Sequence, residues 1–268
     1  VVSGSGGNIS TGFETTSGGT ASGVGTTPVE NYSSNFKFSD ELGSLSAKYE
    51  SRGEATAIGF DKTGGWSYGT YQLASKVGAM GEYLGFLQRK HSTVFETLQN
   101  AGGSSSAKIG TDGFKQTWES LMSSKGAAET QHEYAVVKYF VPAADKVTRS
   151  TGIDVRIKTK TLQDVLWSTA IQHGAGGCNR IFQRAIKSCG NKSPSDDALI
   201  IAVYNERARD NGMAYFGKST NAVRKSVVNR FNNEKLDALK SLELELKEQQ
   251  LQTQTGSAGE AVLPVGPQ

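Results

Sequence analysis

Residues 48–75 read KYESRGEATAIGFDKTGGWSYGTYQLAS, and this stretch decides how the rest of the chain is interpreted. A Tyr-Glu-Ser follows an apolar helical pattern, and Gly53 then stops that pattern. Two short β-prone segments surround the turn-forming sequence DKTGG, an arrangement typical of a β-hairpin. We therefore expect a helix from Asp40 to about Tyr49, followed by a small hairpin formed by TAIGF and WSYGTYQL.

Helical spacing of apolar residues dominates the chain beyond this hairpin. The spacing predicts helices over residues 74–100, near Phe114–Met122, from Ala127 to Phe140 with an end at Pro142, from Leu162 to Gly174, from near Ser195, and one or two beyond Val223. The sequence AGGSSSAKIGTDG between the first two of these is expected to be a loop. The predicted fold class is α+β, mainly α, with one small hairpin inserted after the first helix.

Composition divides the 268 residues into three parts. Residues 1–35 are almost all Gly, Ser, Thr, Val and Asn, so they are predicted to be a flexible arm. Residues 36–232 are the expected globular domain. Residues 233–268 are expected to hold a charged helix and a disordered tail, because no apolar pattern continues beyond about Gln252.

Charge and cysteine content exclude several classes of function. The net charge of +3 is small and its basic residues are scattered, so nucleic acid is not an expected partner. No apolar run is long enough for a membrane span. With three His and two Cys, no metal or other cofactor is expected. Cys178 and Cys189 are equally consistent with a disulfide and with two buried thiols. The start at Val1 is consistent with a processed chain or with a piece of a longer polypeptide.

Glu50 is the first candidate for chemistry, because it follows the last apolar position of its predicted helix. A carboxyl group beside Tyr49 and beneath a loop containing Trp66 would be partly desolvated. Desolvation raises the pKa of a carboxyl group, as a general acid near neutral pH requires. The alternative is a solvated residue at a helix end, paired with Arg52.

Three motifs in order resemble those of the lysozyme superfamily, and most closely those of lytic transglycosylases and goose-type lysozymes. They are Glu50-Ser51, the segment Gly69–Gln72 (GTYQ) and the segment Ala202–Asn205 (AVYN). The sequence WSTAIQHGAGG at residues 167–177 also resembles segments of wall hydrolases from phage tails and secretion spikes. The resemblance implies a lysozyme-like helical catalytic domain, a hairpin after the catalytic helix, and Glu50 as the catalytic acid.

The second carboxylate decides which reaction is expected. Asp61 lies at the hairpin turn, near where goose-type lysozymes place an aspartate that positions water. An inverting glycosidase needs such a base, with room for water between the two carboxyl groups. A transglycosylase needs none, because the 6-hydroxyl of the sugar attacks. Asp61 is equally consistent with a turn residue that caps DKTGG, and Glu54 is a weaker candidate for either role.

The remaining candidates are substrate-binding residues. The full set is Ser51, Tyr68, Gly69, Thr70, Gln72, Gln172, His173, Tyr204 and Asn205. Glycine lets the backbone approach a saccharide, and amides such as Gln72 can hydrogen-bond to acetamido groups. Tyr68 either stacks on a sugar ring or belongs to the core. His173 is either a site residue or a satisfied core or capping histidine.

The resemblance implies an enzyme that cleaves peptidoglycan at the β-1,4 bond between N-acetylmuramic acid and N-acetylglucosamine. It also implies delivery to the periplasm or cell wall by a phage virion, its tail, or a secretion spike. Expected partners are peptidoglycan and other proteins of that apparatus. Two alternatives stay open: a chitosanase-type glycosidase, and a non-catalytic domain that binds glycan or has a structural role.

Overall fold

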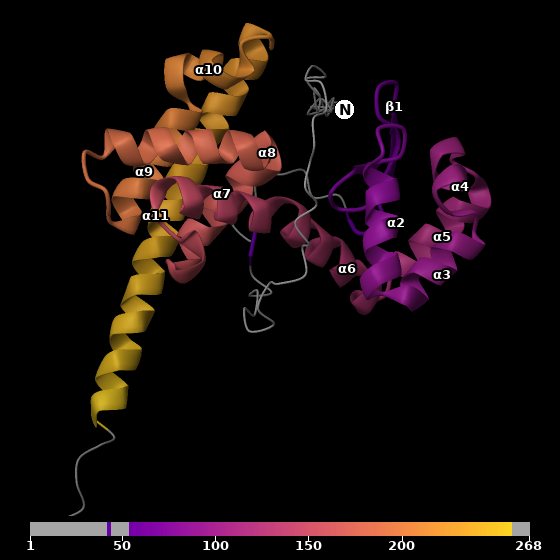
Figure 1. The fold of residues 1–268 in the computed structure, drawn as a ribbon, viewed down its shortest axis with the longest axis horizontal. Helices are drawn as coiled ribbons and strands as arrows, with labels where there is room; N and C mark the ends of the chain where they lie inside the picture. The colour runs from indigo at the N-terminus through magenta and orange to yellow at the C-terminus, as the bar shows by residue number, and fades with distance from the viewer. Residues whose placement is uncertain (1–41, 44–53, 259–268) are drawn as a thin grey trace, which may run out of the picture. The chain divides into compact units, whose positions relative to one another are not determined.

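The computed structural model describes residues 42–43 and 54–258, all of which belong to one compact unit, Asp40–Gln268. It confirms a mainly helical α+β fold with one small antiparallel sheet (Figure 1). The helix predicted at Asp40–Tyr49 and the predicted arm fall outside the described residues, apart from a turn at residues 42–43. The elements in chain order are β1 Ile58–Asp61, β2 Gly65–Tyr68, β3 Leu73–Ala74, α2 Ala79–Lys90, α3 Ser92–Asn100, α4 Gly103–Ile109, α5 Asp112–Met122, α6 Lys125–Ala135, η2 Val136–Phe140, α7 Val141–Thr151, η3 Val155–Ile157, α8 Lys160–Ser188, α9 Asp196–Arg207, η4 Arg209–Gly212, α10 Met213–Phe216 and α11 Asn221–Ala258.

The predicted hairpin is confirmed, and a third strand extends it. Strands β1 and β2 pair antiparallel, with Ile58 opposite Tyr68 and Asp61 opposite Gly65. The short strand β3 pairs with β2, so the sheet order is β1-β2-β3. The predicted second strand, WSYGTYQL, is therefore two strands separated by a turn at residues 69–72.

Helices α2 to α6 pack with the hairpin around one hydrophobic cluster that includes Tyr83 and Trp118. The helical prediction over residues 74–100 is confirmed from Ala79 onward, although the chain breaks at His91 and forms two helices, α2 and α3. The loop predicted after it is wrong. Gly102 and Gly110 adopt left-handed backbone angles at the two ends of α4. The glycines that suggested a loop thus begin and end a short helix.

Pro142 does not end a helix, contrary to the sequence prediction. Helix α6 passes through the π-helical turn η2 into α7, and Pro142 lies in the first turn of α7. The preceding turn is π-helical, with the Val141 N–H bonded to the Val136 carbonyl five residues back, and this shift of the hydrogen bonding precedes the residue that has no N–H to donate.

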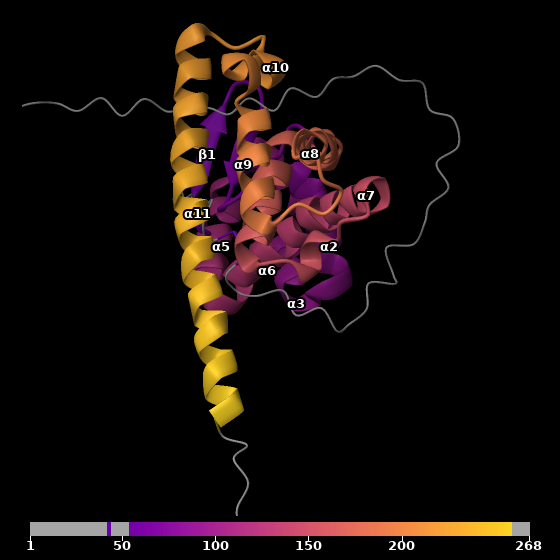
Figure 2. The same cartoon turned by 90° about the vertical axis from the view of Figure 1, so that its left-hand side faces the viewer.

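Helices α7, α8 and α9 pack together, and α11 contacts both α8 and α9 (Figures 1 and 2). The predicted break at Gly174 is present, with φ 64° and ψ 169°, but a second helical segment follows and α8 extends to Ser188. Helix α9 begins after Ser195 as predicted. Helix α11 continues through the expected boundary at residue 232 and past Gln252, so the irregular tail predicted from there is wrong as far as Ala258.

Both cysteines are free thiols, Cys178 buried and Cys189 partly buried. The alternative of two thiols therefore holds in this structure. Burial raises the pKa of the Cys178 thiol above its ordinary value. In the described part of the chain, none of the helices has the length and apolar character needed to cross a bilayer.

Candidate functional site

The turn between β2 and β3 presents polar side chains on a strained backbone. Gly69 has φ 75° and Gln72 has φ 47°, and the Gln72 N–H donates to the Gly69 carbonyl at 3.1 Å. Thr70 and Gln72 are both exposed. A glutamine in the left-handed region costs conformational energy, and such residues concentrate where function requires them. This turn, residues 69–72, is called the Gln72 loop below.

The buried side chain of Gln131 anchors the Gln72 loop. Gln131 is only 1% exposed, and its Oε1 accepts a hydrogen bond from the Thr70 N–H at 2.9 Å. Its Nε2 donates to the Ala55 carbonyl at 3.0 Å. A Cβ at Gly69 would lie 2.1 Å from Oε1 of Gln131, so glycine is required at that position. One amide thus joins the loop to the segment that precedes the hairpin.

Aromatic rings support the loop from the other side. The Tyr71 hydroxyl lies 2.9 Å from Nδ1 of His132, and the Tyr71 ring lies 6.1 Å from the Trp167 ring in an edge-to-face contact. Gly43 lies so close to Trp167 that a Cβ there would be 2.7 Å from Nε1. Its N–H also donates to Oδ1 of Asp164 at 2.6 Å.

Glu50 and Ser51 lie outside the described residues, in the segment 44–53. The described residues on either side of that segment, Gly43 and Ala55, both attach to the framework that holds the Gln72 loop.

Asp61 is the turn residue that one sequence alternative described. It is exposed at the end of β1, and its Oδ1 accepts hydrogen bonds from the N–H groups of Thr63 at 2.8 Å and Gly64 at 2.6 Å. These bonds fix the DKTGG turn, as aspartates do in Asx turns. The contacts of Oδ1 agree with the turn-residue alternative, and the catalytic role of Asp61 stays a prediction.

Tyr68 belongs to the core and not to an exposed face. It is fully buried, its hydroxyl donates to the Ala107 carbonyl at 2.9 Å, and its ring contacts Phe114 and Trp118, each at 5.3 Å. The hypothesis that Tyr68 stacks on a sugar is therefore wrong. Its place at the end of β2 puts its side chain on the face that packs against α5.

Two of the other predicted residues, Gln172 and Tyr204, contact Arg207 of α9. Nη2 of Arg207 donates to Oε1 of Gln172 at 2.8 Å, and its guanidinium lies 5.1 Å from the Tyr204 ring. Tyr204 is buried, so its side chain is not accessible at the surface. Asn205 is exposed and accepts a hydrogen bond from Lys235 at 3.1 Å.

His173 packs between Tyr215 at 5.3 Å and Phe216 at 5.7 Å. Burial, together with the nearby charges of Arg207, Arg230 and Arg180, lowers the pKa of His173 to about 3. The imidazole is therefore neutral at physiological pH. His173 thus packs against aromatic rings as a core histidine would, but its buried Nε2 has no hydrogen-bond partner among the described residues, so it is not the satisfied histidine of the sequence alternative.

Arg207 itself is fully buried and pairs with Glu234 of α11. Its Nη1 lies 3.4 Å from Oε2 of Glu234, and its Nη2 donates to the Ser168 hydroxyl at 3.2 Å. Nε of Arg230 lies 3.0 Å from Oε1 of Glu234, close enough for an ion pair. The cluster fastens α11 to α8 and α9.

Sequence reasoning missed Gln131, Arg207 and Glu234. A signal was present for the last two. Arg207 follows Val203 and Tyr204 by four and three residues, on the buried face of α9. Glu234 interrupts the buried series Phe231, Ala238, Leu242 of α11. A charge of each sign on an apolar helix face predicts a buried pair.

No metal centre is present among residues 42–43 and 54–258, because nowhere there do three or more His, Cys, Asp or Glu side chains come together. The hydrogen bonds described above account for the Gln72 loop without an ion.

Comparison with known proteins places this fold in a family. Residues 42–235 match the family described as type VI secretion system spike protein VgrG3-like, C-terminal. The chain belongs to this family. It is also similar to the type VI secretion system spike protein VgrG3 of Vibrio cholerae serotype O1, with 29% identity over 167 residues. That match covers 60% of this chain and 15% of the relative, so the chain spans a small part of the relative's length.

Membership of the VgrG3-like family corrects the assignment to the lysozyme superfamily, which is wrong. Both comparisons name a spike protein, and neither names a hydrolase. Three of the motifs behind that assignment were only two to four residues long, and the structure gives some residues of the motifs other roles. Tyr204 of AVYN is a core residue, and Gln172 of the WSTAIQHG segment holds Arg207. The broader expectation of a secretion-spike protein agrees with the family.

Proposed function

We propose that this domain is carried by a type VI secretion spike and cleaves the glycan strands of peptidoglycan in the target cell wall. The bond is the β-1,4 link between N-acetylmuramic acid and N-acetylglucosamine. The family and the Vibrio cholerae relative support the link to a spike. The cleavage rests on the Gln72 loop and on the predicted acid, Glu50.

The observation that carries the proposal is the strained, exposed Gln72. A left-handed glutamine in a loop held by the buried Gln131 exposes its amide side chain to solvent. An amide side chain both donates and accepts hydrogen bonds, which suits the acetamido groups of the glycan. The Ala55 carbonyl, five residues after Glu50 in the sequence, accepts a hydrogen bond from the same Gln131.

In the proposed reaction Glu50 gives its proton to the glycosidic oxygen as the C–O bond breaks. The oxygen of water, or the 6-hydroxyl of the sugar, then forms the new bond to the anomeric carbon and loses its proton to the Glu50 carboxylate. Since Oδ1 of Asp61 is engaged in the hairpin turn, the proposal assigns no step to Asp61.

The test is digestion of purified sacculi, followed by mass spectrometry of the released fragments. We expect Glu50→Gln to reduce release at least about a hundredfold, as removal of a general acid does. The matched control is Glu119→Gln, at an exposed glutamate on α5, and it should release fragments at the parent rate. Equal release by Glu50→Gln and the parent would exclude the proposed acid. Reducing ends would indicate water as the nucleophile, and anhydro ends the 6-hydroxyl.

A second candidate is a non-catalytic spike domain that binds the wall or has a structural role. The names of the family and of the relative favour it, because they describe a spike and no reaction. It predicts that the parent and Glu50→Gln sediment equally with sacculi while neither releases fragments. The same preparations therefore separate the two candidates.

A further inference from the structure

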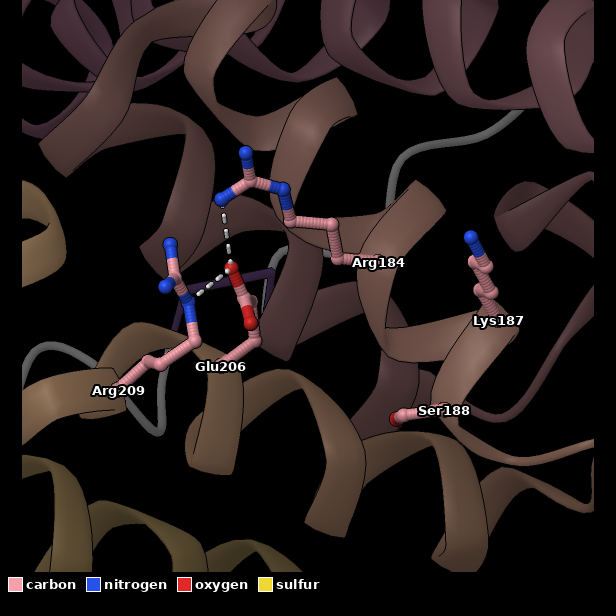
Figure 3. A pocket seen from close by; sticks show the side chains of 5 residues that line it. All are labelled: Arg184, Lys187, Ser188, Glu206 and Arg209. Carbon is pink, nitrogen blue, oxygen red and sulfur yellow. Dashed lines mark hydrogen bonds and ion pairs between the residues drawn. The ribbon is translucent and has the colours of Figure 1, made fainter.

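A shallow basic pocket lies between the second half of α8 and the end of α9 (Figure 3). Its volume is about 500 Å³, and it is open to solvent. The lining residues are Arg184, Lys187, Ser188, Glu206 and Arg209. The pocket thus holds three cationic side chains and one carboxylate.

Glu206 organises the pocket. Its side chain is 10% exposed, and its Oε1 accepts hydrogen bonds from Nη1 of Arg184 at 3.2 Å and from Nε of Arg209 at 3.1 Å (Figure 3). The Tyr215 hydroxyl donates to the same oxygen, and the Tyr215 ring rests on His173. The two guanidinium groups are therefore held in place before any ligand arrives.

The positive charge of the pocket exceeds what its carboxylate neutralises. Lys187 forms no ion pair with any described residue and is exposed. A guanidinium has five N–H donors, so Arg184 retains donors after it pairs with Glu206. Arg209 is also paired with Asp210 at 2.9 Å, so it contributes less. Arg180, exposed one turn before Arg184, extends the charge along α8.

We propose that this pocket binds the free carboxylate groups of the peptide stems of peptidoglycan. A guanidinium takes a carboxylate through two parallel hydrogen bonds, and an ammonium three residues away on the same helix face adds a second charge. The open hollow admits a peptide end together with its side chain. The identity of the ligand rests on the proposed function, whereas the anion preference rests on the pocket alone.

The test measures binding by calorimetry, with Glu50→Gln as the background so that no ligand is cleaved. The probes are a soluble disaccharide tetrapeptide with free carboxylates, the same compound with its carboxylates amidated, and inorganic phosphate at equal ionic strength. The pocket variants are Arg184→Gln and Lys187→Gln. The matched control is Arg149→Gln, at an exposed arginine on α7. Circular dichroism checks that each variant is folded.

We expect each pocket variant to bind the free tetrapeptide about tenfold more weakly, the loss expected for one charge-assisted hydrogen bond. The amidated compound should bind the background protein about as weakly as the free tetrapeptide binds the pocket variants. Arg149→Gln should leave binding of the free tetrapeptide unchanged. Equal binding of the free and amidated compounds, or unchanged binding by both pocket variants, would overturn the proposal. Tighter binding of inorganic phosphate than of the tetrapeptide would also overturn it, in favour of a phosphate-bearing ligand.

The binding measurements and the cleavage assay can fail independently of each other. If Glu50→Gln cleaves sacculi like the parent, or if the parent releases nothing, the binding measurements still decide the role of the pocket. If cleavage is confirmed and the pocket variants bind normally, only the pocket assignment fails.

Discussion

Replacing Glu234 by Gln should destabilise the fold far more than replacing any exposed glutamate of the same helix. Glu234 is 1% exposed and lies 3.4 Å from Arg207 and 3.0 Å from Arg230. The change preserves the shape of the side chain but removes the charge, leaving the fully buried Arg207 without a counter-ion. Breaking a buried pair in this way costs about 3–5 kcal/mol. Since domains of this kind are stable by about 5–15 kcal/mol, the loss is large.

Urea unfolding followed by circular dichroism measures this difference. The matched control is Glu243→Gln on α11, whose carboxylate is exposed and pairs with Lys247 four residues later. Exposed pairs of this type contribute little, so its unfolding midpoint should equal that of the parent. A Glu234→Gln midpoint equal to that of Glu243→Gln would refute the counter-ion argument. The double change Arg207→Met with Glu234→Leu should recover much of the loss, because it removes both buried charges.

Three further changes test the loop and the histidine. Gln72→Gly should raise the free energy of unfolding by at most about 1 kcal/mol, since it relieves the left-handed strain. The same change should reduce fragment release from sacculi. Release equal to the parent's would show that the Gln72 amide is not used. Gln131→Leu leaves the Thr70 N–H and the Ala55 carbonyl without their partner. It should lower the free energy of unfolding in urea by about 2–4 kcal/mol and speed amide exchange at Thr70. An unchanged exchange rate would contradict the anchoring role of Gln131. His173 has a folded pKa of about 3, below its unfolded value of about 6.5. Its contribution to the free energy of unfolding is therefore fully present above pH 6.5 and is lost as the pH drops toward 3. His173→Gln should remove up to about 1.4 kcal/mol per pH unit of this dependence between pH 6 and pH 4, as urea midpoints at each pH would show; identical pH profiles would disprove the buried neutral state.

The hairpin and the helix beginning after Ser195 were predictable because their signals are local. The turn residues of DKTGG act within a few residues of the chain, and so do Asp196 and Asp197, whose negative charges suit the first turn of α9. The same local rules failed at α4, where glycines begin and end a helix instead of making a loop. They failed again at Pro142, which the first turn of α7 accommodates after a π-helical turn. Each failure concerns a helix terminus, where one residue type suits both outcomes.

The contacts of the candidate site were less predictable because they join residues far apart in the sequence. Gln131 reaches Thr70 across 61 positions and Ala55 across 76, and spacing within a helix does not indicate such partners. On α11, Leu236 is 65% exposed although leucine is apolar. The buried face instead runs through Phe231, Glu234 and Ala238, because the charge of Glu234 is matched by Arg207 on another helix.

Helix α8 explains why the WSTAIQHGAGG segment is rich in glycine. Gly174 has φ 64° and ψ 169°, a conformation that is essentially restricted to glycine. A Cβ at Gly177 would lie 2.8 Å from Cβ of His173, so this position also requires glycine. The break turns the helix between Trp167, which contacts Tyr71 of the Gln72 loop, and Arg184 of the basic pocket. The glycines are therefore needed to bend one helix that supports the loop at one end and the pocket at the other.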